Sequence, residues 1–373
     1  NDFGKTIVTF TEKSNQRDSL FWEQNRPIPL TQNESFDYKY KDSVAVVKKF
    51  KADSLRIKSN VFKFKNILNG YSYKSKNNVH SFNFSDLIQI PGYNSVQGIN
   101  LKNSLNYKYN DTINKNNFSA GVDFNYGFSE QKLRTTGFVH KTINYDKRQS
   151  IYVLGGSKLT QYNQNDPITD VVNAVSSLVF RKNFAKYYHK NFISAKFNSK
   201  ITDFMSGSIT LSHEQRKALQ NHSNANPFDI DREYWSNNPL NRTNDAWAFE
   251  TNSIYKMRLN AFFEFGNQYI KRGRSISKIS NTKYPTVHVT YTNALGTNDT
   301  DYHFETIEAQ IKYSKKLAQY GNIQLQTTLT GFINKSADLL FIDYTHFNGN
   351  RTFVYIKNLN NNHFYLMPYY KYS

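Results

Sequence analysis

The segment 116–131, NNFSAGVDFNYGFSEQ, alternates between apolar and polar side chains. Successive side chains of a β-strand point to opposite faces, so this alternation predicts a strand with one apolar and one polar face. A strand of a β-sandwich seldom sustains such alternation with aromatic residues near both ends. The apolar positions are Phe118, Ala120, Val122, Phe124, Tyr126 and Phe128, and the polar positions are Ser119, Gly121, Asp123, Asn125, Gly127 and Ser129.

The same alternation recurs along the chain and predicts an all-β fold of about a dozen strands. No run of about 18 apolar residues is present, which excludes membrane-spanning helices. A transmembrane barrel strand needs only about 10 residues with every second one apolar. The pattern is clear in 97–110, 191–201, 205–212 and 323–330, and weaker in 132–142, 149–157, 253–266, 284–292, 302–313, 351–357 and 363–372.

The lengths of the connections favour an antiparallel up-and-down barrel that crosses a membrane. Outer-membrane barrels have short turns on one side and longer loops on the other. The connection at 129–132 is short, whereas 215–252 and 334–350 are long and polar. Counting strands from 97 places the short 129–132 turn and the long 158–189 segment on the same side, which departs from that rule.

In such a barrel, apolar positions face lipid and polar positions face the lumen. Tyr (27) and Phe (29) are far commoner than Trp (3), and aromatic residues form girdles at both membrane surfaces. The residues predicted to face lipid are Phe118, Val122, Phe124, Phe128, Ile209, Leu211, Leu325 and Leu329. The residues predicted to face the lumen are Asp123, Asn125, Lys196 and Gln324.

Segment 166–186 breaks the strand pattern and predicts an amphipathic helix. Asp166 is a candidate N-cap before Pro167, and Arg181 and Lys182 suit a helix C-terminus. Such an insert plugs the lumen, lies on the periplasmic leaflet or packs on a sheet as an ordinary helix. The apolar residues at helical spacing are Ile168, Val171, Val172, Val175, Leu178 and Val179.

Residues 1–60 differ from the rest and predict a periplasmic lead-in or linker. A strand is expected in FGKTIVTF, residues 3–10. Thr31 and Glu34 form a capping box before apolar residues at helical spacing, which predicts a helix over 32–50.

Lys and Arg total 48 against 29 for Asp and Glu, a net charge of +19. This balance suits nucleic acid, anionic lipid or acidic glycan, and it also follows from AT-rich codon usage. Because the basic residues are spread over alternating faces and turns instead of one patch, we expect no nucleic-acid partner.

No motif indicates catalysis or a cofactor. His213–Glu214 lacks the second histidine of a zinc-protease motif, and no phosphate-binding loop is present. With no cysteine in the chain, thiolate chemistry is excluded. Asp229, Asp231 and Glu233 are a weak calcium candidate, since the glycine and distal glutamate of an EF-hand are missing.

Several motifs resemble a Bacteroidota family of outer-membrane β-barrel proteins of unknown function. The similar segments also include YGFSEQKLR at 126–134 and QYNQNDPITDVVNAVSSLVFRKNFAKYYHKNF at 161–192. The motif residues are Trp22, Arg26, Pro27 and Pro29 in FWEQNRPIPLTQNE, Tyr93 and Gly98 in YNSVQGINL, and Asn348 and Gly349 in HFNGNRT.

The resemblance implies a location and an architecture, with no catalytic residues to transfer. We expect residues 61–373 to form a barrel in the outer membrane of a Gram-negative cell, bounded by lipid and lipopolysaccharide. The family implies a longer protein, with a carboxypeptidase-regulatory-like domain before the barrel and further closing strands after it. The expected role is non-catalytic: transport, protein assembly or translocation, or envelope scaffolding, with other outer-membrane proteins as possible partners. The alternatives are a soluble or surface all-β glycan-binding protein and a barrel enzyme acting on lipid or peptide.

Overall fold

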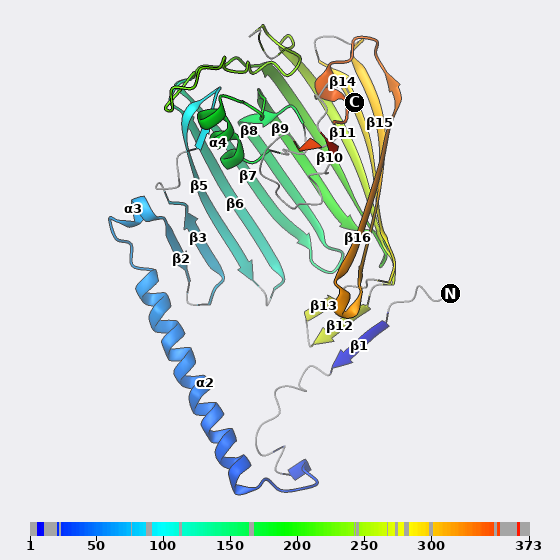
Figure 1. Ribbon diagram of the computed structural model, residues 1–373. Coiled ribbons are helices and arrows are strands. Elements are labelled where there is room, and N and C mark those ends of the chain that lie inside the picture. Colours follow the sequence, from blue (N-terminus) through cyan, green and yellow to red (C-terminus); the bar gives the residue numbers. More distant parts are fainter. Residues whose placement is uncertain are drawn as a thin grey trace.

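The computed structural model describes residues 6–10, 21, 24–75, 77–86, 92–111, 114–163, 168–241, 243, 246–266, 268–272, 275–279, 283–297, 301–346, 349–350 and 364–365. One curved, 13-stranded antiparallel sheet dominates it (Figure 1). The strand order is β16-β15-β14-β11-β10-β9-β8-β7-β6-β5-β3-β2, with β4 beside β5, so the sheet runs up and down as predicted. Among the described residues, the edge strands β2 and β16 do not pair with each other, and the sheet is not closed into a barrel.

Ten strands of 11 to 14 residues make up most of the sheet. Each coincides with a segment of period-two alternation, so these predicted strands are confirmed. Their bounds are β5 Gly98–Asp111, β6 Asn116–Gly127, β7 Lys132–Asn144, β8 Gln149–Gln161, β9 Tyr187–Lys200, β10 Met205–Ala218, β11 Asn252–Glu264, β14 Thr286–Gly296, β15 His303–Lys316 and β16 Asn322–Lys335.

The remaining strands are short, and most of them were not predicted. The predicted strand at 351–357 lies outside the described residues, and of 363–372 only β18 is described. The predicted strand within 3–10 is confirmed as β1, which pairs in parallel with β12. The short strands are β1 Thr6–Phe10, β2 Tyr71–Lys74, β3 His80–Phe84, β4 Gly92–Asn94, β12 Gln268–Arg272, β13 Ser275–Ile279, β17 Gly349–Asn350 and β18 Phe364–Tyr365.

Helix α2, Gln32–Ser59, projects from the end of the sheet (Figure 1). It begins where predicted, because Thr31 and Glu34 form the expected capping box. The Glu34 amide donates to Thr31 Oγ1 at 3.3 Å, and the Thr31 amide donates to Glu34 Oε2 at 2.9 Å. The helix extends well beyond the predicted end at residue 50, since neither proline nor glycine interrupts it. The short helices are α3 Asn66–Asn69, η1 Ala318–Tyr320 and η2 Phe341–Asp343.

Helix α4, Asp170–Phe180, is shorter than the predicted 166–186 helix. Thr169 caps it by accepting from the Val172 amide, while Asp166 and Pro167 lie outside the described residues. Arg181 adopts a left-handed conformation (φ 54°), which ends the helix, and its amide donates to the Ser176 and Ser177 carbonyls. The predicted extension to 186 is therefore wrong.

The face that α4 buries also differs from the prediction. Val171 is 70% exposed, whereas Val172 is buried. The other buried residues of α4 are polar: Asn173, Ser176 and Ser177. Hydrogen bonds satisfy two of their polar atoms, since Asn173 Oδ1 accepts from the Ala185 amide at 2.8 Å and Ser176 Oγ donates to the Val172 carbonyl at 2.7 Å.

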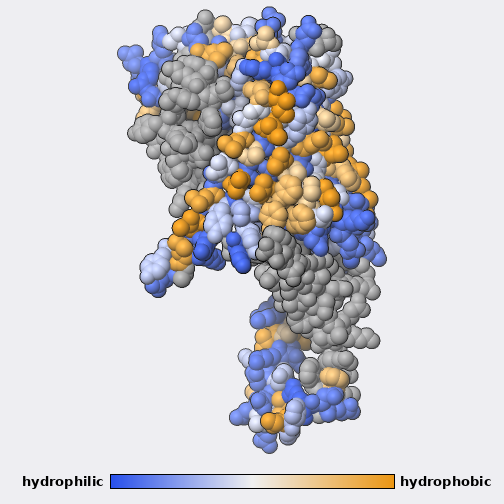
Figure 2. Space-filling model, turned by 90° about the vertical axis from the view of Figure 1, so that its right-hand side faces the viewer, coloured by the Kyte–Doolittle hydropathy of each residue, from blue (hydrophilic) through white to orange (hydrophobic). Residues whose placement is uncertain are grey.

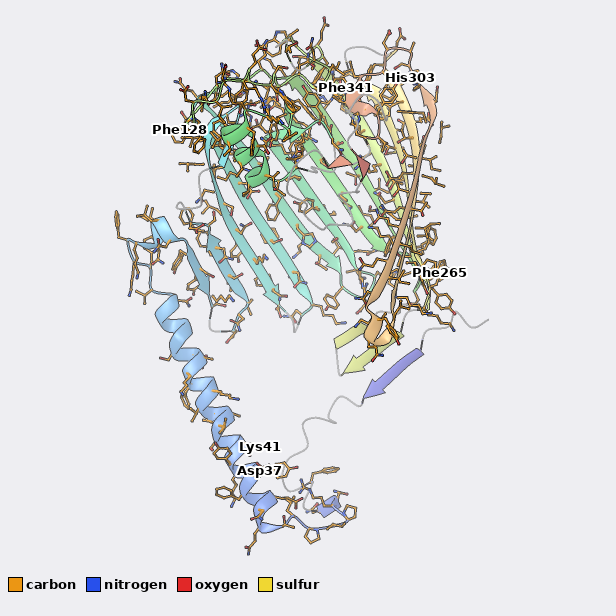
Figure 3. All side chains as sticks on the ribbon, viewed as in Figure 1. Asp37, Lys41, Phe128, Phe265, His303 and Phe341 are labelled. Carbon is orange, nitrogen blue, oxygen red and sulfur yellow. The ribbon has the colours of Figure 1, made fainter. Side chains whose placement is uncertain are left out.

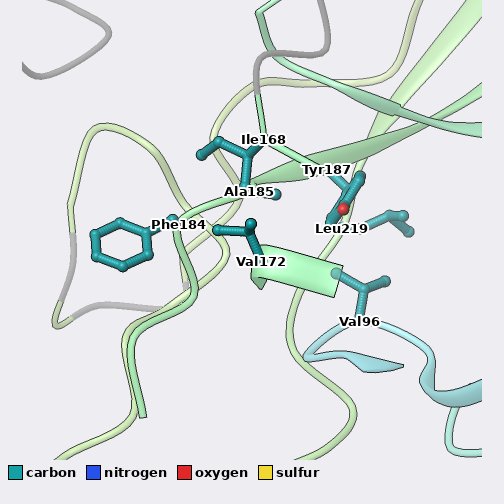
Figure 4. Close-up of a cluster of buried hydrophobic side chains, with 7 residues drawn as sticks. All are labelled: Val96, Ile168, Val172, Phe184, Ala185, Tyr187 and Leu219. Carbon is teal, nitrogen blue, oxygen red and sulfur yellow. The ribbon is translucent and has the colours of Figure 1, made fainter. Parts of the chain in front are cut away.

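The buried apolar clusters gather at the end of the sheet that carries α4 and the long loops. One packs against α4 (Figure 4) and consists of Val96, Ile168, Val172, Phe184, Ala185, Tyr187 and Leu219. Two other clusters hold the segment after β16 against the sheet. The first consists of Tyr162, Tyr188, Ala218, Phe249 and Ile342, and the second of Ile254, Ala294, Tyr302, Phe304 and Leu339.

Candidate functional site

The sheet has one apolar and one polar face. Residues paired directly across antiparallel strands lie on the same face, so the registers define rows that cross ten strands. One such row is apolar except for Lys141 and Gly331. Its members, from β5 to β16, are Tyr109, Phe118, Lys141, Ile151, Phe197, Ile209, Leu259, Tyr291, Ile307 and Gly331.

The adjacent row is displaced by one residue on each strand, so its side chains point to the opposite face of the sheet. This row is mainly polar. It contains three basic residues, a histidine and four hydroxyl-bearing Ser and Thr residues, with aromatic residues on β8 and β16. Its members are Lys108, Ser119, His140, Tyr152, Lys196, Thr210, Arg258, Thr292, Thr306 and Phe332.

The predicted face residues follow this division. The registers place Phe118, Val122, Phe124, Ile209, Leu211, Leu325 and Leu329 on the apolar face, and Asp123, Asn125, Lys196 and Gln324 on the polar face. Phe128 lies just after β6, where it packs edge-on against Tyr126 with ring centroids 5.1 Å apart.

The apolar face is exposed, although apolar side chains in a strand usually pack against a second layer. Exposure reaches 49% at Ile209, 56% at Leu211, 61% at Leu325 and 68% at Leu329. Figure 2 shows hydrophobic residues spread over the strands on the side that is at the right in Figure 1. An exposed apolar surface of this extent marks an interaction site.

A buried charge cluster lies where β10, β11 and the segment after β16 meet. Asp343 accepts from Arg216 at 2.6 Å and from Lys256 at 3.3 Å, and its side chain is completely buried. Glu214 lies 3.3 Å from Lys190 and 3.6 Å from Lys256. We call these five residues the charge cluster. They leave three positive charges facing two negative ones.

Tyr302 completes the contacts of Asp343, since its hydroxyl donates to Asp343 Oδ2 at 2.5 Å. Burial alone would raise the pKa of the Asp343 carboxyl, but Lys256 and Arg216 outweigh burial and lower that pKa below its ordinary value. Burial and the neighbouring carboxylate raise the pKa of the Tyr302 hydroxyl. The cluster therefore holds an ionised carboxylate that fastens the segment after β16 to the sheet.

A second buried ion pair joins β7 to the turn that precedes it. Arg134, 1% exposed, binds both carboxylate oxygens of Glu130 at 2.7 and 2.5 Å. Its Nε donates to His189 Nδ1 at 3.1 Å. The bidentate geometry fixes the guanidinium, which in turn positions the His189 ring.

The weaker sequence candidates do not come together as a site. Asp229, Asp231 and Glu233 are all exposed, and within the described residues no group of three or more acidic or histidine side chains could hold a metal ion. The His213 ring lies tilted against Tyr255 with ring centroids 4.8 Å apart, while its neighbour Glu214 belongs to the charge cluster.

Two residues of the family motifs have clear structural roles. Gly98 has a φ of 65°, and a Cβ atom there would lie 2.0 Å from Ser129 Oγ, so the turn from β4 into β5 requires glycine. Tyr93 is buried, and its hydroxyl lies 3.1 Å from Ser223 Oγ. Arg26, Pro27 and Pro29 precede α2 and Gly349 lies in β17, whereas Trp22 and Asn348 lie outside the described residues.

A family described as "Family of unknown function (DUF5686) C-terminal domain" matches residues 64–373. The chain belongs to this DUF5686 family. The DUF5686 match covers the entire 13-stranded sheet and leaves α2 outside. No curated protein and no solved structure matches the chain. None of the helices in the described part of the chain has the length and hydrophobicity needed to cross a membrane.

Proposed function

We propose that the sheet is part of the wall of an outer-membrane β-barrel, with its apolar face against lipid and its polar face toward the interior. The protein's role is non-catalytic: transport, protein assembly or translocation, or scaffolding of the envelope. The exposed apolar face, continuous across ten strands, carries the proposal. In water such a surface would aggregate, whereas acyl chains solvate it.

Three further features support this placement. The strands have 11 to 14 residues, and about 9 to 11 suffice for a tilted strand to cross the hydrocarbon core. The charge cluster lies on the polar side, where its ionised groups are paired with one another and face away from the apolar face. Aromatic pairs mark both ends of the sheet: Tyr126 with Phe128, and Phe204 stacked on Phe265 with ring centroids 6.0 Å apart. Phe128 and Phe265 lie at opposite ends in Figure 3.

Site-directed spin labelling tests the proposal directly, because the chain contains no cysteine. Single cysteines at Ser208, Ile209, Thr210 and Leu211 would carry nitroxides in protein reconstituted into vesicles. Ile209 and Leu211 should be more accessible to oxygen, which concentrates in lipid, and Ser208 and Thr210 to a water-soluble nickel complex. Each position serves as the control for its neighbour.

The expected result is an accessibility ratio that alternates with every residue. A ratio that stays constant over the four positions would contradict the proposal. So would full-length protein that stays in the aqueous fraction without detergent or lipid.

A further inference from the structure

The basic residues of the long strands gather on the polar face of the sheet. The registers place every Lys and Arg residue of the ten long strands on this face except Lys141, Lys217 and Lys315. This differs from the spread over alternating faces that the sequence suggested. The carboxylates of these strands that share the polar face are Asp123, Glu214, Glu264 and Glu308. Positive charge is therefore in excess on this face.

Only part of this positive charge is neutralised within the protein. The cations of the polar face that form ion pairs are Lys102, Arg134, Lys190, Lys200, Arg216 and Lys256. Others have no ion-pair partner among the described residues, and these include Lys108, Lys158, Lys196, Arg258 and Lys312. A wall that carries one sign of charge in excess focuses the field and attracts ions of the opposite sign.

Two of the unpaired cations lie close together near the middle of the sheet. Thr210 of β10 pairs with Lys196 of β9 on one side and with Arg258 of β11 on the other. Two strand spacings, roughly 10 Å, therefore separate the Lys196 and Arg258 backbones, and their long side chains can reach a common ligand. Arg258 is exposed and Lys196 is half-buried. We call these three residues and the flanking pairs of rows on the same strands the basic patch.

The flanking rows of the basic patch contain no carboxylate. Apart from Lys256 of the charge cluster, they consist of neutral side chains that can donate hydrogen bonds. The flanking residues are Ser194, Asn198, Ser208, Ser212, Lys256 and Asn260. Ammonium, guanidinium and hydroxyl donors without a competing carboxylate are suited to phosphate and carboxylate oxygens.

A cavity of about 400 Å³ extends from the basic patch to the turn end of the sheet, with Lys196, Asn198, Ser208 and Asn260 among its lining residues. Its volume falls in the range of small-molecule sites, roughly 300–1,000 Å³. The carboxylates that line it lie toward the turns. Asp203 is paired with Lys200, and Glu264 lies about 13 Å beyond Asn260 along β11. The end of the cavity at the basic patch is therefore its positive end.

We infer that the basic patch binds a small multivalent anion that carries phosphate or carboxylate groups. Lys196 and Arg258 each hold one anionic group, and the hydroxyls of Thr210 and the flanking serines donate to the oxygens between them. The inference deepens the proposed function by naming the class of solute, and it rests on that function only for placing this face toward the interior.

The test measures binding of tripolyphosphate and of citrate to the full chain in a non-ionic detergent by calorimetry. Added salt should weaken the binding, because it screens the charges. The double variant Lys196→Gln with Arg258→Gln should bind at least about tenfold more weakly, since it loses two charged donors. Lys141→Gln is the matched control. It removes the same charge from the apolar face, so it should bind like the wild type. The double variant Lys196→Arg with Arg258→Lys keeps both charges and should retain binding.

Saturable binding of either anion, weakened in the charge-removing double variant and kept in Lys141→Gln, supports the inference. Absence of saturable binding for both anions overturns it, as does equal binding by that double variant and wild type. Tighter binding of a single-stranded oligothymidylate than of tripolyphosphate overturns the assignment of a small ligand. None of these measurements requires a bilayer, so a negative result would leave the alternating accessibility of the spin labels unaffected.

Discussion

The two ends of strands β8, β9 and β10 lie in different surroundings. Toward the short turns, exposed residues alternate with less exposed ones. On β9 the exposed positions are Ile193, Ala195 and Phe197. At the other end, all residues from Asn183 to His189 are buried, which means that protein covers both faces of the sheet there. Alternation of exposure therefore occurs where the two faces of the sheet lie in different surroundings. It disappears where loops and α4 enclose the strand.

This difference predicts that the enclosed end is sensitive to loss of charge and that the turn end is not. Asp343→Asn should lower the free energy of unfolding by about 3–5 kcal/mol, because Arg216 and Lys256 would remain buried without their partner. Urea unfolding in lipid vesicles measures this loss. Asp146→Asn is the control, since Asp146 pairs with Lys115 at the turn end and is 71% exposed, so the loss there should stay below about 1 kcal/mol. Similar losses in the two variants would contradict the comparison.

Acidification provides a second test of Asp343. Its folded pKa is lowered from an ordinary value of 3.8, so the unfolded chain takes up the proton first as the pH falls. The stability due to Asp343 is fully present above that ordinary value and is lost as the pH falls through the lowered folded pKa. Unfolding of wild type and Asp343→Asn at pH 6 and below pH 3.8 should show the difference between them shrinking in acid. If the difference in unfolding free energy between the two proteins is the same at both pH values, ionisation of Asp343 is not its cause.

At the turn end, the energetic cost of a charged substitution should depend on which face of the sheet carries the residue. If the apolar face meets lipid, Leu211→Arg should cost about 2–4 kcal/mol in a bilayer, whereas Thr210→Arg on the polar face should cost much less. Folding yield and unfolding in vesicles measure both. Equal costs would contradict a lipid-facing role for Leu211.

The smallest expected effect concerns α4. Val172→Ala should cost about 1–2 kcal/mol, since Val172 is buried in the cluster with Ile168 and Tyr187. Val171→Ala should change stability by less than about 0.5 kcal/mol because Val171 is 70% exposed. Thermal unfolding distinguishes them. A reversed order would contradict the burial of Val172 and the exposure of Val171.

Much of the sheet could be predicted from sequence because period-two alternation is a local signal. The strands β2 (YSYK) and β3 (HSFNF) alternate too, but with 4 and 5 residues they are too short to give a distinct signal. The end of α4 was missed because Arg181 adopts a left-handed conformation that glycine usually takes.

The charge cluster had no local signal. Arg216 and Asp343 are 127 residues apart, and neither lies in a recognisable motif. The same holds for the cavity of about 340 Å³ beside α4, whose amides, Asn94, Gln97, Asn125 and Gln161, come from three strands and a turn. Composition shows only that Asn and Gln are present, whereas burial and bonding decide which of them lacks a partner.

The distance in sequence between Arg216 and Asp343 constrains the order in which the protein is assembled. Before the segment that carries Asp343 packs against the sheet, Arg216 lacks the carboxylate with which it pairs in the folded protein, and Lys256 keeps only its 3.6 Å contact with Glu214 among the ion pairs of the described residues. Water must then continue to solvate these two cations. Closure of the enclosed end therefore requires the segment after β16 and cannot precede its arrival.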